Sequence, residues 1–397
     1  MKNEKYNDTL IGASLKLILL LPITTLLQML FPFSVNRILT SLILFVLAII
    51  IFQNMNSKLI VKFMITVLVV MTTFIFTQKV MMNLDDAIYW MLYLCCLTLF
   101  NNKYIVNRYY DEFFRNISFV KFIIAITEII IIITLFIPSA YRYSESWGGK
   151  YFCSYAYSPH TMTTTIIFIE LLIITYFLLV KFKIYYLILF FPLVLAVLKS
   201  GARTFLISFI LLMVFFILNS TKSKTKAIII LGIVGIGVLY FYMQSATFEK
   251  MEFLSAKNTY GTNKVATMSS GRTVFWLNDI QAFFDLPFLN KIFGKGFDYV
   301  YGVNERTLGT AIWAHNDFVN NLLSVGVLGS LWYLIVLFMF LFKLVSSKKY
   351  SMVVLLQLFV LVTAFFAGFY IYVGLIFSLL LIAIIVLERK GENVVAS

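Results

Sequence analysis

Long blocks of apolar residues, separated by short polar connections, run along almost the whole chain. The blocks are 16 to 25 residues long, and a helix needs about 20 apolar residues to cross the hydrocarbon core of a bilayer. We therefore predict an all-α, polytopic integral membrane protein with about twelve transmembrane helices. Their centres lie near residues 20, 45, 68, 93, 128, 170, 190, 211, 235, 329, 359 and 379. The fourth block, AIYWMLYLCCLTLF, is short.

Two connections on the same predicted side of the membrane are much longer than the others. One covers residues 139–160 and the other covers residues 244–314. The second connection divides the chain into three parts. These are an N-terminal membrane region with nine spans (1–243), a large loop (244–314), and a C-terminal part with three spans and a tail (315–397).

The large loop contains a helix signal of its own. The stretch SSGRTVFWLNDIQAFFDLP begins with Ser270 in an N-cap position and ends at Pro287. Its apolar residues recur at helical spacing, at Phe275, Trp276, Ile280, Phe283 and Phe284. We expect an amphipathic helix that lies on the membrane surface or packs over the mouths of the spans. Gly294-Lys295-Gly296 predicts a turn, after which the chain re-enters the membrane directly behind His315.

The composition differs from that of a soluble domain. Hydrophobic residues make up 61% of the chain and charged residues only 13%, against about half and about a quarter in soluble domains. The net charge of +14 would in another protein indicate nucleic-acid binding. Here the short connections leave no room for a folded nucleic-acid-binding module, so we expect no nucleic-acid partner.

The positive charges are divided unevenly between the two sets of connections. The termini and one set carry eighteen Lys and Arg residues, and the alternate short connections carry six. Because Lys and Arg concentrate on the cytoplasmic side of short loops, we predict that both termini are cytoplasmic and that the large loop is extracytoplasmic. The eighteen are Lys2, Lys5, Lys58, Lys62, Lys103, Arg108, Arg115, Lys121, Lys181, Lys183, Lys222, Lys224, Lys226, Lys343, Lys348, Lys349, Arg389 and Lys390. The six are Arg37, Lys79, Arg142, Lys150, Lys199 and Arg203.

Several classes of site are missing from the sequence. Cys95, Cys96 and Cys153 have neither metal-ligand nor redox spacing and indicate no disulfide framework. With only two histidines in the chain, we expect no zinc site. Phosphate loops, dinucleotide fingerprints and serine-hydrolase elbows are absent as well.

Polar residues gather on the predicted extracytoplasmic side. The stretch LKSGARTFLISF places Lys199 and Arg203 at a tight reversal between the seventh and eighth spans, and the large loop adds Arg272 and His315. A guanidinium matches two phosphate oxygens and a helix start offers backbone N–H groups, so Arg203 and Arg272 are candidate anion ligands. Each residue has an alternative interpretation. Arg203 suits a snorkelling anchor, Arg272 a solvated loop charge, and His315 an interfacial histidine bonded to a neighbour.

Two further pairs of polar residues can each be interpreted in more than one way. Asn316 and Asp317 follow His315, and both residue types favour helix N-cap positions. Glu128 and Glu170 lie near the middle of predicted spans. An intramembrane carboxyl is a functional candidate because burying its charge is costly. The alternative is a protonated carboxyl that is hydrogen-bonded between helices.

Three stretches, in this order along the chain, carry a family resemblance. They are SGART between two late spans, the large loop with SGR and GKG, and HNDFVNNLLSVGVLG at the opening of the next span. Together they resemble the O-antigen polymerase and O-antigen ligase superfamily of bacterial envelope glycosyltransferases over roughly residues 195–345. In one respect the chain departs from that pattern. Family versions often carry an acidic residue before the glycine of the last element, whereas here Ser324-Val325 precedes Gly326.

The resemblance implies a GT-C class enzyme of the bacterial cytoplasmic membrane, without a nucleotide, metal or other cofactor. Such enzymes move a glycan from undecaprenyl pyrophosphate to an acceptor hydroxyl on the outer face of the membrane. By this resemblance, Arg203 and Arg272 would hold the pyrophosphate and His315 would act as base or orient the reacting hydroxyl. Further candidates for substrate binding are Lys199, Asn316 and Asp317.

The expected function is the polymerisation of a surface polysaccharide, such as O-antigen, capsule or exopolysaccharide, by transfer of the growing chain to the next lipid-linked repeat unit. The expected partners are the undecaprenyl-pyrophosphate-linked oligosaccharide, membrane lipid, and the flippase and chain-length regulator of the same pathway. A ligase would differ only in its acceptor, which would be lipid A core, a wall polymer or a protein. A transporter or flippase is the alternative from another class. Glu128 and Glu170 would suit ion coupling, but the two halves of the chain are unlike, whereas transporters often consist of repeats.

Overall fold

Eighteen α-helices and one β-hairpin form the part of the chain that the computed structural model describes. The described residues are 2–54, 56–145, 147–180, 184–221, 223–256, 266, 269–346 and 352–387. Part of the predicted charge asymmetry lies outside these residues, at Lys181, Lys183, Lys222, Lys348, Lys349, Arg389 and Lys390.

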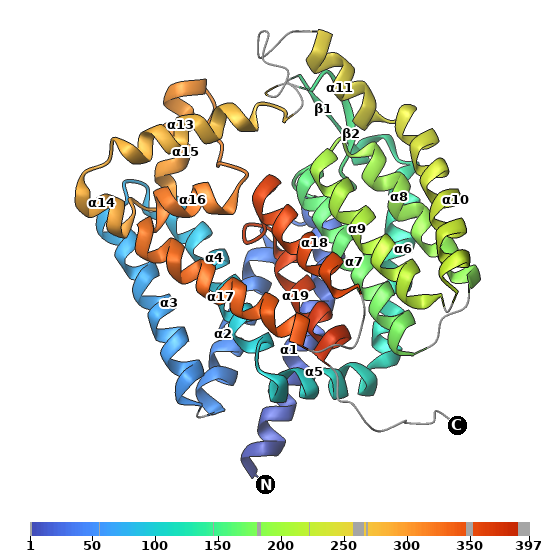
Figure 1. Cartoon of the computed structure of the whole chain (residues 1–397), viewed down its shortest axis with the longest axis horizontal. Coiled ribbons are helices and arrows are strands. Elements are labelled where there is room, and N and C mark those ends of the chain that lie inside the picture. The colour runs from blue at the N-terminus through green and yellow to red at the C-terminus, as the bar shows by residue number, and fades with distance from the viewer. Residues whose placement is uncertain are drawn as a thin grey trace.

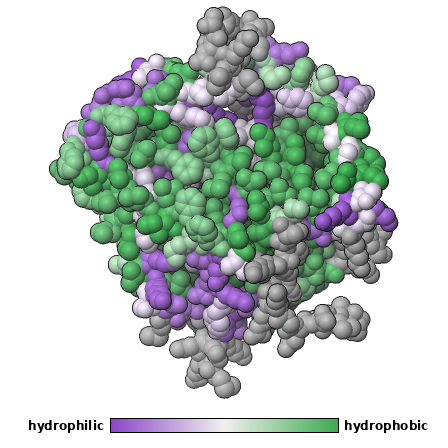
Figure 2. Space-filling view, in the orientation of Figure 1, coloured by the Kyte–Doolittle hydropathy of each residue, from purple (hydrophilic) through white to green (hydrophobic). Residues whose placement is uncertain are grey.

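Nine described helices are long and apolar enough to cross a membrane, so the chain is a multi-pass membrane protein, as predicted. They are α1 (Lys2–Leu26), α2 (Val35–Gln53), α3 (Ser57–Phe76), α4 (Val80–Phe100), α6 (Ile117–Leu135), α7 (Pro159–Leu179), α9 (Arg203–Ser220), α10 (Lys224–Met243) and α17 (Gly326–Ser346). On the face shown in Figure 2, hydrophobic side chains cover the middle of the molecule and hydrophilic ones gather toward its upper and lower edges.

The predicted count of twelve spans is wrong. The segments centred near residues 190, 359 and 379 form shorter apolar helices of 10–17 residues. They are α8 (Phe190–Lys199), preceded by the 3-10 helix η3 (Ile184–Leu189), α18 (Val353–Phe366) and α19 (Val373–Leu387). At about 1.5 Å per residue, such helices are about 20 Å long, whereas the hydrocarbon core is about 30 Å thick. Every residue of α19 from Leu375 to Leu387 is buried, so its apolar composition reflects a position in the protein core.

The elements outside the spans lie mainly at one end of the helix bundle, which we call the loop end (Figure 1). They are β1 (Tyr141–Ser144), β2 (Gly149–Phe152), α11 (Ala246–Ala256), α13 (Arg272–Phe284), α14 (Phe288–Phe293), α15 (Asp298–Leu308) and α16 (Asp317–Ser324), with the 3-10 turns η1 (Gln28–Leu30) and η2 (Pro138–Ala140). The helix α5 (Lys103–Arg115) lies at the opposite end, where α1 begins (Figure 1). The antiparallel hairpin β1–β2, which pairs Tyr141 with Phe152, was not expected from the sequence.

The amphipathic helix predicted in the large loop is α13. It ends before Pro287, as expected, but its N-cap is Gly271 and not Ser270. The hydroxyl of Ser270 instead accepts a hydrogen bond from the guanidinium of Arg203 on α9. Trp276 packs edge-on against Phe365 at the end of α18, with 5.3 Å between the ring centroids. The helix therefore packs over the mouth of the bundle, one of the two expected positions.

The turn predicted at Gly294-Lys295-Gly296 is present and fastens the large loop to α16. The amide of Lys295 donates to the carbonyl of Leu323 at 2.9 Å, and the amide of Gly296 donates to the carbonyl of Ser324 at 3.0 Å. These two bonds satisfy carbonyls in the last turn of α16, which has no following turn to satisfy them.

The chain does not enter a span directly behind His315, as the sequence had suggested. The short helix α16 ends at Ser324, and the span α17 begins at Gly326. Gly326 has a φ of 67°, and a Cβ at this position would collide with the backbone of Ile292 and Gly294. Only glycine meets both conditions, so Gly326 allows the break that separates α16 from the span.

We predict that β1 faces the extracytoplasmic side and α5 the cytoplasm. Tyr143 and Tyr104 are 65% and 51% exposed and lie at opposite ends of the bundle, while all three native cysteines are buried. A membrane-impermeant maleimide should therefore label Tyr143→Cys in intact cells, and should label Tyr104→Cys only after permeabilisation. Labelling of Tyr104→Cys in intact cells would reverse the orientation.

Candidate active site

Five nitrogen-bearing side chains from separate segments meet at the loop end. They come from the starts of α7, α9 and α13, from α11, and from the residue two positions before α16. We call them the cationic cluster, which consists of His160, Arg203, Lys250, Arg272 and His315. The three residues that the sequence nominated for chemistry, Arg203, Arg272 and His315, all belong to it.

The two arginines are held by reciprocal hydrogen bonds between α9 and the segment that opens α13. Arg203 on α9 donates to the hydroxyl of Ser270, and Arg272 on α13 donates to the hydroxyl of Thr204 on α9. Each guanidinium is thus oriented by the segment that carries the other. This arrangement brings together residues that are far apart in sequence.

The reversal before Arg203 depends on Gly201. This residue has a φ of 70°, and a Cβ would lie 2.5 Å from a ring carbon of Tyr151 on β2. The carbonyl of Gly201 accepts a hydrogen bond from Nζ of Lys250 at 3.3 Å. The same ammonium lies 3.2 Å from the ring centroid of Trp147, a cation–π contact. The turn therefore places Lys250 beside Arg203.

The two histidines of the chain lie next to each other. Their ring centroids are 5.9 Å apart and the rings are nearly perpendicular, at 86°. Trp313 lies against His315 with 4.7 Å between centroids, and Trp147 lies 5.4 Å from His160. The Nδ1 atoms of both histidines are buried, and neither has a hydrogen-bond partner among the described residues. Both rings thus keep hydrogen-bonding capacity for a ligand.

His315 also has an uncommon backbone conformation. Its φ is 52°, in the left-handed region, which non-glycine residues occupy only at a cost. Ser270, which bonds Arg203, is a second such residue, with a φ of 55°. Strained residues of this kind concentrate at functional sites, where the surrounding fold holds them in place.

The charges of the cluster perturb one another. Burial lowers the pKa of Lys250 well below its ordinary value, and the nearby charges of Arg203 and Arg272 lower it further. Burial lowers the pKa of Arg272 to about 10. Burial, followed by the charges of Arg272, His160 and Lys250, lowers the pKa of His315 well below its ordinary value. At neutral pH His315 is therefore uncharged.

No carboxylate of a described residue forms an ion pair with Lys250 or Arg272. Lys250 is only 4% exposed, and burial without a counter-ion disfavours its charged form. A ligand with two or more negative charges would supply the missing counter-charge. The cluster is therefore suited to bind a polyanion such as pyrophosphate.

Asn316 and Asp317, nominated as substrate ligands, are engaged in holding α16. Asn316 is its N-cap, and its side-chain oxygen accepts from the amides of Phe318 and Val319 at 2.9 and 3.1 Å. The carboxyl of Asp317 accepts from the hydroxyl of Tyr333 at 2.8 Å and from the amide of Phe369 at 2.9 Å. Both are buried, and burial raises the pKa of Asp317 to about 7.

The next two asparagines of the same stretch also fasten α16 to neighbouring elements. The side-chain oxygen of Asn321 accepts from the indole N–H of Trp90 on α4 at 2.9 Å. Asn320 donates to the hydroxyl of Tyr370 between α18 and α19. The polar side chains that follow His315 in HNDFVNNLLS thus fix the position of α16, and with it the position of His315 just before the helix.

Lys199, the remaining nominated ligand, is exposed and points to the hairpin. Its ammonium donates to the hydroxyl of Tyr141 on β1 at 3.4 Å. His160 and Lys250 were not predicted from the sequence as members of the site. A signal for His160 was available, because both histidines of the chain stand next to the start of an apolar block. For Lys250 the sequence offered no signal, since one lysine in a long polar loop is unremarkable.

Glu128 on α6 and Glu170 on α7 lie outside the cluster. They are 5% and 0% exposed, and none of their carboxyl oxygens has a hydrogen-bond partner among the described residues. The interhelical hydrogen bond considered as an alternative is therefore not found in the described part of the chain.

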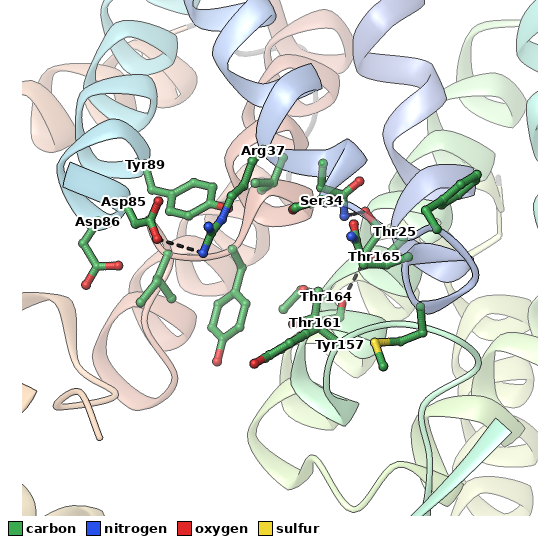
Figure 3. Close-up of a pocket in the computed structure, with 18 of the residues that line it drawn as sticks. Thr25, Ser34, Arg37, Asp85, Asp86, Tyr89, Tyr157, Thr161, Thr164 and Thr165 are labelled. Atoms are coloured by element: carbon green, nitrogen blue, oxygen red, sulfur yellow. Dashed lines mark hydrogen bonds and ion pairs between the residues drawn. The ribbon is translucent and has the colours of Figure 1, made fainter. Parts of the chain in front are cut away.

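A cavity of about 730 Å³ adjoins the cluster. It is lined by residues of α1, α2, α4 and α7 and of the turn before α19 (Figure 3). Trp313, which contacts His315, and Tyr372, which lies 6.1 Å from Trp313, belong to its wall. The cavity thus lies next to the cationic cluster, and Trp313 contacts both.

No protein-family model matches the chain, and no curated protein matches it. The resemblance to O-antigen polymerases and ligases is therefore a hypothesis that rests on the stretches quoted above.

We predict that inorganic pyrophosphate stabilises the purified protein. At about ten times its Kd, a ligand of the native state adds about 1.4 kcal/mol to the free energy of unfolding. The thermal unfolding midpoint should rise with pyrophosphate in the wild type and should not rise in Arg272→Gln. Lys199→Gln, which also removes a positive charge at the loop end, should retain the wild-type rise. Equal rises in all three proteins would show that the cluster binds no pyrophosphate.

Proposed function

We propose that this chain is a membrane glycosyltransferase that polymerises a surface polysaccharide. It transfers the growing glycan from undecaprenyl pyrophosphate to a hydroxyl of the next lipid-linked repeat unit, at the outer face of the bacterial cytoplasmic membrane. The observation that carries the proposal is the cationic cluster, with two reciprocally held arginines, a buried lysine and a neutral histidine. A lipid-linked donor presents its pyrophosphate at headgroup level, next to the ends of the spans.

The arginines and Lys250 act on the leaving group. In the transfer, the acceptor oxygen bonds to the anomeric carbon while the bond from this carbon to the pyrophosphate oxygen breaks, and that oxygen keeps the electron pair. Negative charge therefore grows on the pyrophosphate as the transition state forms. Fixed positive charges in a partly water-excluded site stabilise this growing charge more than they stabilise the ground state.

His315 takes the proton of the attacking hydroxyl. A neutral imidazole is required, and burial, assisted by the charges of Arg272 and Lys250, keeps His315 neutral in the free protein. When the donor binds, its negative charges offset those of Arg272 and Lys250. This removes part of the effect that lowers the pKa of His315, so the pKa rises and His315 becomes a stronger base once the donor is in place. Attack opposite the leaving group inverts the anomeric configuration.

The acceptor separates the two enzymes of the superfamily. A polymerase uses a second lipid-linked repeat unit, and a ligase uses lipid A core, a wall polymer or a protein. The cluster serves either reaction because it acts on the donor. A product that is longer and still lipid-linked supports the polymerase, and transfer only to another acceptor supports the ligase.

One observation favours a transporter instead. Glu170 is fully buried on α7, and neither of its carboxyl oxygens has a hydrogen-bond partner among the described residues. A carboxyl of this kind suits ion coupling in a transporter or flippase. A transporter forms no glycosidic product with purified protein, so the assay below separates the two functions.

We predict that His315→Ala abolishes most transfer without abolishing donor binding. Loss of a general base lowers the rate about 100-fold or more, while the cations that bind pyrophosphate remain. The assay uses purified protein with lipid-linked repeat units and measures longer lipid-linked glycan. Pyrophosphate-induced stabilisation in the variant is the control for fold and donor binding. Near-normal turnover would remove His315 from the mechanism.

We also predict that donor binding moves the acid limb of the pH–rate profile. In free protein the lowered pKa of His315 keeps the base form present well below pH 6.5, so kcat/KM should fall only in more acidic solution. In the donor complex the pKa is higher, so kcat should fall at a higher pH than kcat/KM. Rates at saturating and low donor concentration, measured between about pH 5 and pH 8, test this. Coincident acid limbs would contradict the proposed coupling.

A further inference from the structure

Two kinds of residue in the lining of the cavity beside the cluster decide what it can bind. One kind is aromatic and consists of Phe31, Phe33, Tyr89, Tyr157, Trp313 and Tyr372. The other kind forms hydrogen bonds and consists of Gln28, Arg37, Asp85, Asp86, Thr161 and Thr165. In Figure 3, Arg37 and Asp85 face each other on one side of the cavity, and the threonines of α7 lie on the other. We call this cavity the slot. Aromatic and polar side chains both line it.

The polar groups of the slot have unused hydrogen-bonding capacity. Arg37 and Asp85 are 2.8 Å apart, but their side chains remain 66% and 39% exposed. The side-chain oxygen of Gln28 is buried and has no hydrogen-bond partner among the described residues. A guanidinium and a carboxylate each offer two parallel contacts, which match a pair of neighbouring hydroxyl groups. The wall is therefore suited to a ligand with several hydroxyls.

The charge of the slot differs from that of the cationic cluster. Asp85, Asp86 and Arg37 together carry two carboxyl groups and one guanidinium, so the slot offers no excess of positive charge. A polyanion would therefore bind the cluster and not the slot. A lipid tail would remove water from the partly exposed ion pair of Arg37 and Asp85 without offering any hydrogen bond in return, which is costly.

A sugar matches both the aromatic and the hydrogen-bonding residues of the slot. A pyranose ring has a face of C–H groups that packs on aromatic rings, and hydroxyls around its edge that bond carboxylates and guanidinium groups. A volume of about 730 Å³ lies within the range of about 300–1,000 Å³ that is typical of small-molecule sites, and it has room for more than one ring.

Trp313 joins the slot to the reacting centre. It lines the slot on one side and lies 4.7 Å from the ring of His315 on the other, and Thr161 of the slot follows His160 directly. A sugar in the slot would thus lie next to the reacting centre, with Trp313 between the slot and the ring of His315. An acceptor held there would be close to the donor that the arginines bind in the proposed function.

We infer that this slot binds the acceptor glycan, with its reacting sugar against Trp313 and its hydroxyls on Asp85 and Arg37. The inference rests on the proposed function for the role of the sugar as acceptor. It assigns to α1, α2 and α4 a binding function that no motif in the sequence indicated.

The binding test uses the oligosaccharide that mild acid releases from the lipid-linked repeat units of the producing cells, which carries neither lipid nor phosphate. Saturation-transfer NMR on the purified full chain should detect binding to the wild type. Asp85→Asn and Tyr157→Ala should each weaken the affinity about tenfold or more, since they remove a charged hydrogen-bond partner and an aromatic wall. Tyr157 is 72% exposed, so its truncation should leave the core intact.

The matched control is Glu305→Gln. Among the described residues, Glu305 also forms an ion pair at the loop end, with Lys79 at 3.7 Å. As with Arg37 and Asp85, both side chains are partly exposed, but Glu305 does not line the slot. This variant should bind the oligosaccharide as the wild type does. All variants should keep the stabilisation by pyrophosphate, because the cluster is unchanged.

In the transfer assay, Asp85→Asn should raise the KM for the acceptor about tenfold and leave the KM for the donor unchanged. A wild type that does not bind the oligosaccharide, or slot variants that match Glu305→Gln in both assays, would overturn the inference. A raised donor KM would assign the slot to the donor sugar and would overturn it as well. Binding of the oligosaccharide without any transfer would refute the proposed function but leave the slot as a sugar site.

Discussion

The structure depends on the concentration of like charge at one end of a membrane helix bundle. Lys250, Arg203 and Arg272 perturb one another, and burial makes their mutual repulsion more costly than it would be in water. The fold opposes this cost with fixed hydrogen bonds. Arg203 and Arg272 are held crosswise by Ser270 and Thr204, and Lys250 by the carbonyl of Gly201. In the proposed function, a polyanion would stabilise this site strongly, because it would relieve the repulsion between charges that are already in place.

The position of His315 depends on a different kind of interaction. It precedes an eight-residue helix that is too short to be stable alone. Hydrogen bonds fasten this helix to three neighbours, through Asn321 to α4, through Asp317 to α17, and through Asp317 and Asn320 to the turn between α18 and α19. His315, with its left-handed backbone, lies two residues before this fastened helix. The fixed position of α16 therefore limits where His315 can lie.

The short helices α18 and α19 explain why a cavity can lie beside this site. Both helices are shorter than a full span, and the turn between them contributes Ile371 and Tyr372 to the cavity wall. On α4 the wall reaches Tyr89, nine residues after the helix begins at Val80, which is about 13 Å along its axis. The cavity therefore extends below the ends of the long helices. A lipid-linked acceptor could present its glycan there while its lipid stays in the bilayer.

The sequence by itself determined the membrane class, an apolar helix at each of the twelve expected positions, the amphipathic helix α13 and the turn at Gly294-Lys295-Gly296. These features follow from local composition and periodicity, which are properties of neighbouring residues. The sequence also nominated Arg203 and Arg272, because a guanidinium matches two phosphate oxygens and each residue opens a helix. It nominated His315 because one of only two histidines lies at the start of an apolar segment.

Only the tertiary structure decided the rest. Apolar composition does not fix the length of a helix and does not distinguish a lipid-facing span from a helix buried in protein. For this reason α8 and α18, which are too short, and α19, which is short and buried, were counted as full spans. The separation of α16 from α17 depends on a close approach between Gly326 and the backbone of Ile292, far away in sequence. His160, Lys250 and the cavity between α1, α2, α4 and α7 were not found because no pattern along the chain records which helix ends meet. The contacts that bring them together are between distant segments, and those contacts exist only after the chain has packed.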